Sequence, residues 1–220
     1  MRKGFAAAFA LACLSWQATA NADPIVNSTN VGTVAQWASA PDATASIGDK
    51  NYVYLGSTGW NGTESVVLYD NTLEQRHTID FGNLFGYVGP TTLTVDYRID
   101  ITSSNYFSEA FIDQDWTSGS VTQTLLGYSS LADYNGNNPL FTLTATDTTI
   151  PGPTTIDPTI RQMWFRETIS LVASGGGQLF SASNTVGQSS VPEIDPASAG
   201  SVLSLVTGVL ALLERRRRTT

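Results

Sequence analysis

The sequence predicts an all-β protein, a single antiparallel β-sandwich of jelly-roll or immunoglobulin-like type, between an N-terminal signal peptide and a C-terminal transmembrane helix. Three observations carry the prediction of the sandwich: short segments in which apolar and polar residues alternate, clusters of Gly, Asn, Ser, Thr and Pro between them, and few stretches that favour a helix. Nine such segments within one domain length are typical of two packed sheets.

The clearest strand covers residues 91–102, with the sequence TTLTVDYRIDIT. Its apolar and polar side chains alternate, so one face of the strand is expected to be buried. Eight further runs have a similar pattern: residues 51–55, 65–69, 75–81, 106–112, 121–126, 140–146, 162–172 and 178–182. The segments GSTGWNGT, DYNGNNP and SGGGQ between these runs have the composition of turns.

The remaining parts of the body are less regular. Residues 23–49 are rich in Ala, Ser and Thr and are expected to form either a first edge strand or a loose leader. Residues 156–166 begin either as a strand or with a helical turn capped by Asp157. Residues 184–190 are polar without a pattern and are expected to form a linker. The predicted domain therefore spans residues 23–183.

Residues 1–22 have the pattern of a secretory signal peptide. Two basic residues are followed by an apolar run over residues 5–14 and by the small residues Ala20 and Ala22 at the expected cleavage site. The one cysteine of the chain, Cys13, lies inside that run, so the mature protein is expected to have none. An exported domain without disulfide bonds depends on core burial and backbone pairing.

The C-terminus carries a second membrane signal. Residues 197–213 are 17 residues without a charge, roughly 25 Å of helix and the short limit for a transmembrane span. Four arginines follow: Arg215, Arg216, Arg217 and Arg218. The positive-inside rule keeps these arginines in the cytoplasm and the body outside. The alternative, an amphipathic helix packed on the domain, is disfavoured because apolar residues cover too much of the helix for one stripe.

Physical chemistry explains part of the stretch before this helix. Asp195 and Pro196 favour a helix start, because an aspartate side chain accepts from the free N–H groups of the first turn and proline loses no hydrogen bond there. Pro192 keeps Val191 extended. Neither effect gives a reason for Glu193.

The complete motif reads Val191, Pro192, Glu193, Ile194, Asp195, Pro196, Ala197 and Ser198. Together with the apolar helix and the terminal arginines, it resembles the PEP-CTERM protein-sorting signal in its VPEID form. The second proline stands here at Pro196, after Ile194 and Asp195. The resemblance covers residues 191–220 and leaves the body unassigned.

The resemblance implies a Gram-negative bacterium, export by the general secretory route, and transient anchoring in the inner membrane by the C-terminal helix, with the body in the periplasm. In that family an exosortase, a membrane-embedded cysteine transpeptidase-like enzyme, recognises the motif and removes the tail. Such proteins accompany exopolysaccharide and biofilm-matrix systems. The resemblance therefore implies a cell-surface or extracellular destination, with the chain as the substrate of the exosortase.

The body is strongly acidic. Residues 23–190 contain 16 acidic and 5 basic residues, a net charge of −11. This charge argues against nucleic acid as a partner and against adsorption to anionic lipid. It is compatible with binding cations, although the sequence predicts no cofactor.

The sequence contains no recognisable catalytic arrangement, so the protein is predicted not to be an enzyme. His77 is the only histidine, and it alternates with Ile79 and Phe81, which favours a structural histidine on their face over a catalytic one. The motifs GxSxG, HExxH and the P-loop are absent. Asp113 and Asp115 would lie on one face of a strand, a pair that could suit glycoside hydrolysis.

Two further groups of residues are candidates for binding. The acceptors Asp133, Asn135 and Asn137 resemble the start of a calcium loop, although a plain Asn-Gly hairpin turn explains the segment equally well. Trp60 and Trp116 stand in segments of small polar residues and either contact a glycan or fold back to cover the sandwich end.

These observations together predict a non-enzymatic, exported surface or extracellular-matrix protein with a structural or adhesive function, sorted through its C-terminal signal in association with exopolysaccharide or biofilm. The alternative is a carbohydrate-binding module, and a glycan-cleaving enzyme ranks behind both.

Overall fold

The computed structural model describes residues 26–84, 87, 90–116, 120–157, 159–172 and 179–190. The predicted signal peptide with its cleavage site at Ala20 and Ala22 lies outside the described residues. The predicted sorting motif, transmembrane helix and arginine cluster of residues 191–220 lie outside them as well. Among the described residues, no helix has the length and apolar character needed to cross a membrane.

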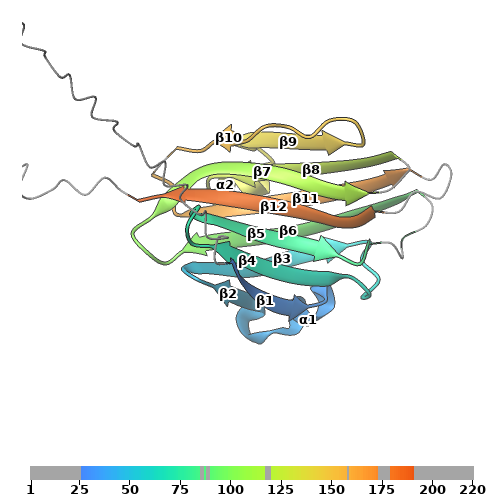
Figure 1. Ribbon diagram of the computed structural model, residues 1–220, viewed down its shortest axis with the longest axis horizontal. Helices are drawn as coiled ribbons and strands as arrows, with labels where there is room; N and C mark the ends of the chain where they lie inside the picture. Colours follow the sequence, from blue (N-terminus) through green and yellow to red (C-terminus); the bar gives the residue numbers. More distant parts are fainter. Residues whose placement is uncertain are drawn as a thin grey trace, which may run out of the picture.

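The described chain is all-β, with two six-stranded antiparallel sheets packed face to face around one core (Figure 1). Sheet I has the strand order β1 (Val26–Gly32), β4 (Ser65–Asn71), β5 (Arg76–Gly82), β12 (Leu179–Ser189), β7 (Tyr106–Trp116) and β10 (Thr154–Thr155). Sheet II has the order β2 (Thr44–Ile47), β3 (Lys50–Thr58), β6 (Thr91–Ile101), β11 (Gln162–Val172), β8 (Ser120–Tyr128) and β9 (Phe141–Thr146).

The core forms because the inward positions of the strands are apolar. In β6 the buried side chains are Leu93, Val95, Tyr97, Ile99 and Ile101, which confirms the alternation predicted from the sequence. Aromatic rings fill the middle of the sandwich around Phe165. Its ring lies 5.3 Å from that of Tyr97 and 6.4 Å from that of Phe107, measured between centroids. Such contacts add to the stabilisation that burial of the rings provides.

A short helix closes one side of the sandwich. The helix α1 (Val34–Ser39) begins with a capping box between Thr33 and Gln36 and packs against strands of both sheets. Its Trp37 is fully buried and donates its indole N–H to the carbonyl of Tyr52 at 3.3 Å. Residues 26–47 are therefore structured, with β1 as an edge strand, α1, the 3₁₀ turn Pro41–Ala43 and β2, and are not a loose leader.

Each of the nine predicted strands falls on an observed strand, but the predicted linker at residues 184–190 is wrong. The strand β12 continues to Ser189 and lies in the middle of sheet I, between β5 and β7. The sequence hides this strand because an inward position carries Asn184, which is only 2% exposed. The domain therefore extends at least six residues beyond the predicted boundary at residue 183.

Candidate functional site

The outer face of sheet I carries an aligned row of four side chains. Tyr69 pairs with Thr78, Thr78 with Thr185, and Thr185 with Phe111, across strands β4, β5, β12 and β7. The residues next to them in each strand point inward, so these four point away from the core. The hydroxyl groups of Thr78 and Thr185 lie 2.7 Å apart and bond to each other.

The row forms a groove because the two strands in its middle, β5 and β12, carry small side chains, whereas the strands at its two ends, β4 and β7, carry large ones. Thr78 and Thr185 form the floor, while Tyr69 and Phe111, both half-buried, stand on either side. The groove comprises two adjoining hollows. The first, of about 330 Å³, is lined by Tyr69, Asn71, Glu74, Arg76, Thr78, Phe111 and Thr185. The second, of about 360 Å³, is lined by Arg76, Phe111, Ile112, Asp113, Ile150, Pro151 and Pro153.

Arg76 and Phe111 border both hollows and form the ridge between them. The guanidinium carbon of Arg76 lies 5.1 Å from the centroid of the Phe111 ring, a cation–π contact. Its Nε donates to Glu109 at 3.1 Å and its Nη1 to Glu74 at 3.4 Å. The positive charge of the groove is therefore already balanced by two carboxylates.

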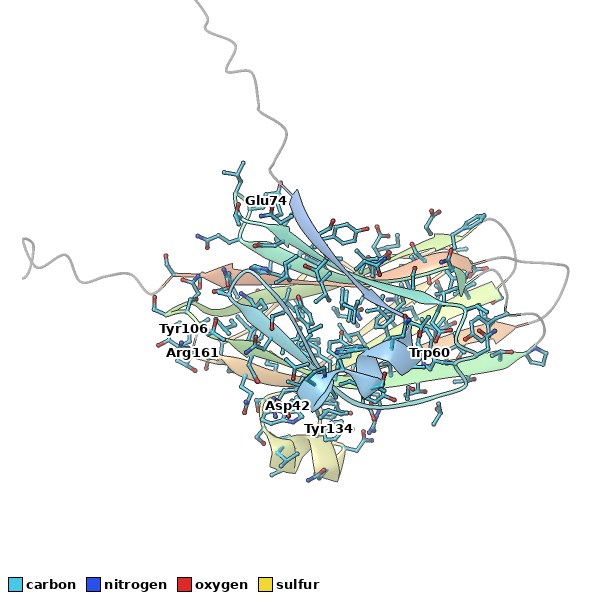
Figure 2. The ribbon with its side chains drawn as sticks, turned by 90° about the horizontal axis from the view of Figure 1, so that it is seen from below. Asp42, Trp60, Glu74, Tyr106, Tyr134 and Arg161 are labelled. Carbon is cyan, nitrogen blue, oxygen red and sulfur yellow. The ribbon has the colours of Figure 1, made fainter. Side chains whose placement is uncertain are left out.

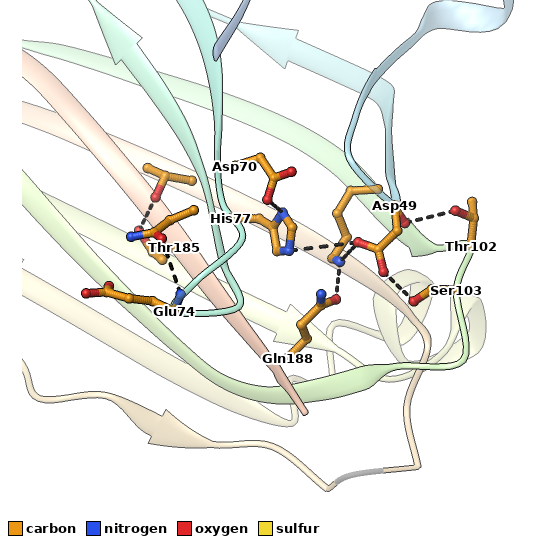
Figure 3. Close-up of polar contacts among 11 residues, drawn as sticks. Asp49, Asp70, Glu74, His77, Thr102, Ser103, Thr185 and Gln188 are labelled. Atoms are coloured by element: carbon orange, nitrogen blue, oxygen red, sulfur yellow. Dashed lines mark hydrogen bonds and ion pairs between the residues drawn. The ribbon is translucent and has the colours of Figure 1, made fainter. Parts of the chain in front are cut away.

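A glycine in the next row makes this arrangement possible. Gly187 lies between Arg76 and Glu109 in the register of the sheet. A Cβ at Gly187 would come within 2.5 Å of the Glu109 side chain, so any other residue would push that carboxylate away from Arg76. Glu74 and Thr185, which both line the first hollow, are labelled in Figure 3.

Only one member of the predicted carboxylate pair lines this groove. Asp113 and Asp115 are both exposed on the outer face of β7, as the alternation predicts. Asp113 lines the second hollow, whereas Asp115 lines neither hollow. A glycosidase needs two carboxyl groups flanking the bond that is cleaved. Of this predicted pair, only Asp113 lines a hollow, and the other carboxyl group that lines the groove, Glu74, stands in the first hollow.

The two tryptophans proposed as glycan contacts do not line the groove among its described residues. Trp60 donates its indole N–H to the carbonyl of Thr94 at 2.7 Å and packs 5.3 Å from the ring of Phe81. These contacts fit the interpretation of a tryptophan that folds back over the sandwich end. Figure 2 shows Trp60 toward the end opposite to Tyr106 and Arg161. The side chain of Trp116 lies outside the described residues.

The interpretation of residues 133–138 as a plain Asn-Gly hairpin turn is wrong, because the segment contains a short helix, α2 (Leu131–Gly136), capped by Ser130. The Asp133 carboxylate accepts from the hydroxyls of Ser129 and Ser130, and the side-chain oxygen of Asn137 accepts from Tyr128. Asn135, two residues from Asp133, points to another side of the helix. In the part of the chain that the structure describes, no group of three or more His, Cys, Asp or Glu side chains is placed to hold a metal ion.

A buried ionic cluster lies between the sheets near the Gln188 end of β12 (Figure 3). Its members, here called the Lys50 cluster, are Asp49, Lys50, Asp70, His77 and Gln188. The Nζ of Lys50, a fully buried side chain, donates to Asp49 and to the side-chain oxygen of Gln188. His77 has Nδ1 3.2 Å from Asp70 and Nε2 3.8 Å from Asp49. His77 is buried on the face of Ile79 and Phe81, which confirms the predicted orientation.

Burial controls the protonation of this cluster. It lowers the pKa of Lys50, opposed by Asp49, and lowers the pKa of His77 to about 4, so that His77 is neutral at neutral pH. Burial also raises the pKa of Asp70, opposed by Lys50. For Asp49 burial acts in the same upward direction, but hydrogen bonds from Lys50 and Ser103 outweigh it and the pKa lies below its usual range.

A second buried polar cluster lies deeper in the core, and its members are Glu167, Gln123, Asn184 and Tyr97. The Glu167 carboxyl accepts from Gln123 at 2.8 Å and from Asn184, whose amide also donates to Tyr97 at 2.9 Å. Burial raises the pKa of Glu167 to about 8, against the hydrogen bonds from Gln123 and Asn184. Neither buried cluster was predicted. The alternation in β11 does place Glu167 on the inward face, between Phe165 and Ile169, and could have predicted a buried carboxyl group there.

No protein-family model and no curated protein matches this chain. One solved structure with a likeness to it is titled "Structure of TmCBM61 in complex with beta-1,4-galactotriose". The two chains share 9% sequence identity over 62% of this chain and 88% of that one, with a TM-score of 0.29. A TM-score this low does not establish a shared fold, so nothing about the ligand of this chain follows from it.

Proposed function

We propose that this chain is a non-enzymatic, exported surface or matrix protein that binds a glycan in the groove of sheet I. The observation that carries the proposal is the row Tyr69, Thr78, Thr185 and Phe111, in which two aromatic side chains flank a floor of hydroxyl groups. Sugar rings have apolar faces that stack on aromatic rings and hydroxyl edges that need hydrogen-bond partners. A groove with both kinds of contact suits them.

The positions of the acid–base groups support a binding function over a catalytic one. His77 is buried between the sheets, away from the outer face that carries the groove. Of the predicted pair, only Asp113 lines a hollow, and Asp115 does not. A hydrolase would need a second group poised beside Asp113.

We also infer that the sandwich is of the jelly-roll type. From β5 onward, the chain crosses repeatedly between the two sheets. The order in sheet I is then β5, β12, β7 and β10, and the order in sheet II is β6, β11, β8 and β9. This is the order that two interleaved Greek keys give an eight-stranded jelly roll. The four strands β1 to β4 then widen both sheets at one side.

Steric blocking of the floor tests the groove. We expect Thr78→Arg and Thr185→Arg each to weaken binding to the exopolysaccharide of the host by about tenfold or more, because the arginine side chain fills the first hollow. Sedimentation with the insoluble polysaccharide measures the bound fraction, and circular dichroism verifies the fold.

The matched control is Thr142→Arg, the same substitution at an exposed position on β9 of the other sheet. It should bind as the unmodified protein does. Equal binding by all three variants would remove the groove as the site.

The export and sorting proposal has its own test. The strand β12 ends at Ser189, so the motif beginning at Val191 follows the folded domain almost directly. Intact mass and C-terminal peptide mapping of protein from the host surface and medium should give a mature chain that starts near Asp23 and ends within residues 191–197. A mature chain that keeps Arg215 and the arginines after it would contradict removal of the tail.

A further inference from the structure

We propose that the groove takes a neutral glycan chain that lies across the strands, over both hollows, and covers at least three sugar residues. The inference rests on the proposed function and adds the direction, the length and the charge class of the ligand.

The direction follows from the register of sheet I. Tyr69 on β4 and Phe111 on β7 belong to one row, with β5 and β12 between them. Three inter-strand spacings of about 4.8 Å separate their backbones by roughly 14 Å. The second hollow continues beyond Phe111 toward Ile150 and Pro151. The two hollows therefore form one track at right angles to the strands, which is longer than a single sugar.

The length follows from where the apolar contacts stand along this track. Tyr69 contributes one in the first hollow, and the Phe111 ring, on the ridge, contributes the second. The third is Ile150, a large apolar side chain that is 54% exposed, held between Thr149 and Pro151 at the rim of the second hollow. Pro151 and Pro153 restrict that rim before a ligand arrives, which lowers the entropy cost of binding. A ligand reaches all three contacts only if it extends over both hollows.

The charge class follows from the carboxylates along the track. The guanidinium of Arg76 is already paired with Glu74 and Glu109, and Asp113 lines the second hollow. A uronate or a sulfated sugar would meet this negative potential within a domain of net charge −11. The hydroxyl groups of a neutral sugar can donate to the carboxylates and accept from the guanidinium and the threonines.

The test is isothermal titration calorimetry of the folded domain with neutral cello- and manno-oligosaccharides and with oligogalacturonates, each of one to six residues. We expect at least one neutral series to bind, with affinity rising by about tenfold or more between one and three residues and then levelling off. The oligogalacturonates should bind at least about tenfold more weakly at equal length and low salt.

Substitutions separate the two hollows. Phe111→Ala should remove most of the gain with length because the ring borders both hollows, and Ile150→Ser should reduce the affinity only for chains of three residues or more. Tyr106→Ala is the matched control, an aromatic side chain of the same strand that lines neither hollow. It should leave all affinities unchanged.

Three outcomes overturn the inference. Affinity that is constant beyond one residue, or a preference for oligogalacturonates, would exclude the neutral extended ligand while glycan binding itself stands. Absence of binding to any sugar, together with a dimer in light scattering that Thr78→Arg dissociates, would exclude the proposed function as well and identify the face as an interface between copies of this chain.

Discussion

We expect Lys50→Met to lower the free energy of unfolding by about 3–5 kcal/mol at pH 7, because removing one partner of a buried ion pair leaves an uncompensated charge. Methionine is unbranched and only one atom shorter than lysine, so most of the loss reports the charge rather than a cavity. The substitution leaves Asp49 and Asp70 facing the interior without a cation at Nζ. It also removes the contact between β3 of one sheet and Gln188 in β12 of the other.

Urea denaturation measures this loss, and two further variants make it interpretable. Asp49→Asn added to Lys50→Met should restore part of the stability, because it removes one of the carboxylates left without a partner. Arg161→Met, which removes an exposed cation that lies 5.8 Å from the Tyr106 ring, should cost less than about 1 kcal/mol. If Lys50→Met cost no more than Arg161→Met, the buried pair would contribute no more than a surface contact.

Much of the fold was predictable because its strands bury apolar side chains at every second position. The strand β11 matches its predicted range at both ends, and β6 matches to within one residue. The prediction failed where this local signal is missing. Asn184 occupies an inward position of β12, and Ser130 starts the helix α2 in a segment whose composition is that of a turn.

The groove was not predictable, because its four central residues are distant in the sequence and become neighbours only through strand pairing. Thr78 and Thr185 are 107 positions apart, yet their hydroxyl groups bond to each other. Register between such strands is set by the packing of the whole sandwich, and a shift of one residue would turn Tyr69 and Phe111 toward the core. Trp60 and Trp116 were predicted as glycan contacts because they are large aromatic residues in polar segments. The described aromatic side chains that line the groove are instead Tyr69 and Phe111.

The two buried clusters give opposite pH dependences. The pKa of Glu167 is raised from 4.5 to about 8, so its contribution to stability is present in full below pH 4.5 and is lost as the pH rises toward 8. The pKa of His77 is lowered from 6.5 to about 4, so its contribution is present above pH 6.5 and is lost as the pH falls toward 4. The protein is therefore expected to be most stable between about pH 4.5 and 6.5.

We expect Glu167→Gln to remove the loss on the alkaline side and to stabilise the protein at pH 8 by on the order of 3 kcal/mol relative to the unmodified chain. Glutamine keeps the shape of the side chain without a charge. The side-chain oxygen of Gln123 has no partner among the described residues. It can accept a hydrogen bond from the new amide once the amide group of Gln123 has turned round. Thermal or urea unfolding from pH 4 to pH 9 measures both curves. They should be similar near pH 5, separate above it, and keep the same acid limb, because His77 is unchanged. Curves that remain parallel up to pH 9 would show that Glu167 ionises without a penalty and that water reaches the centre of the core.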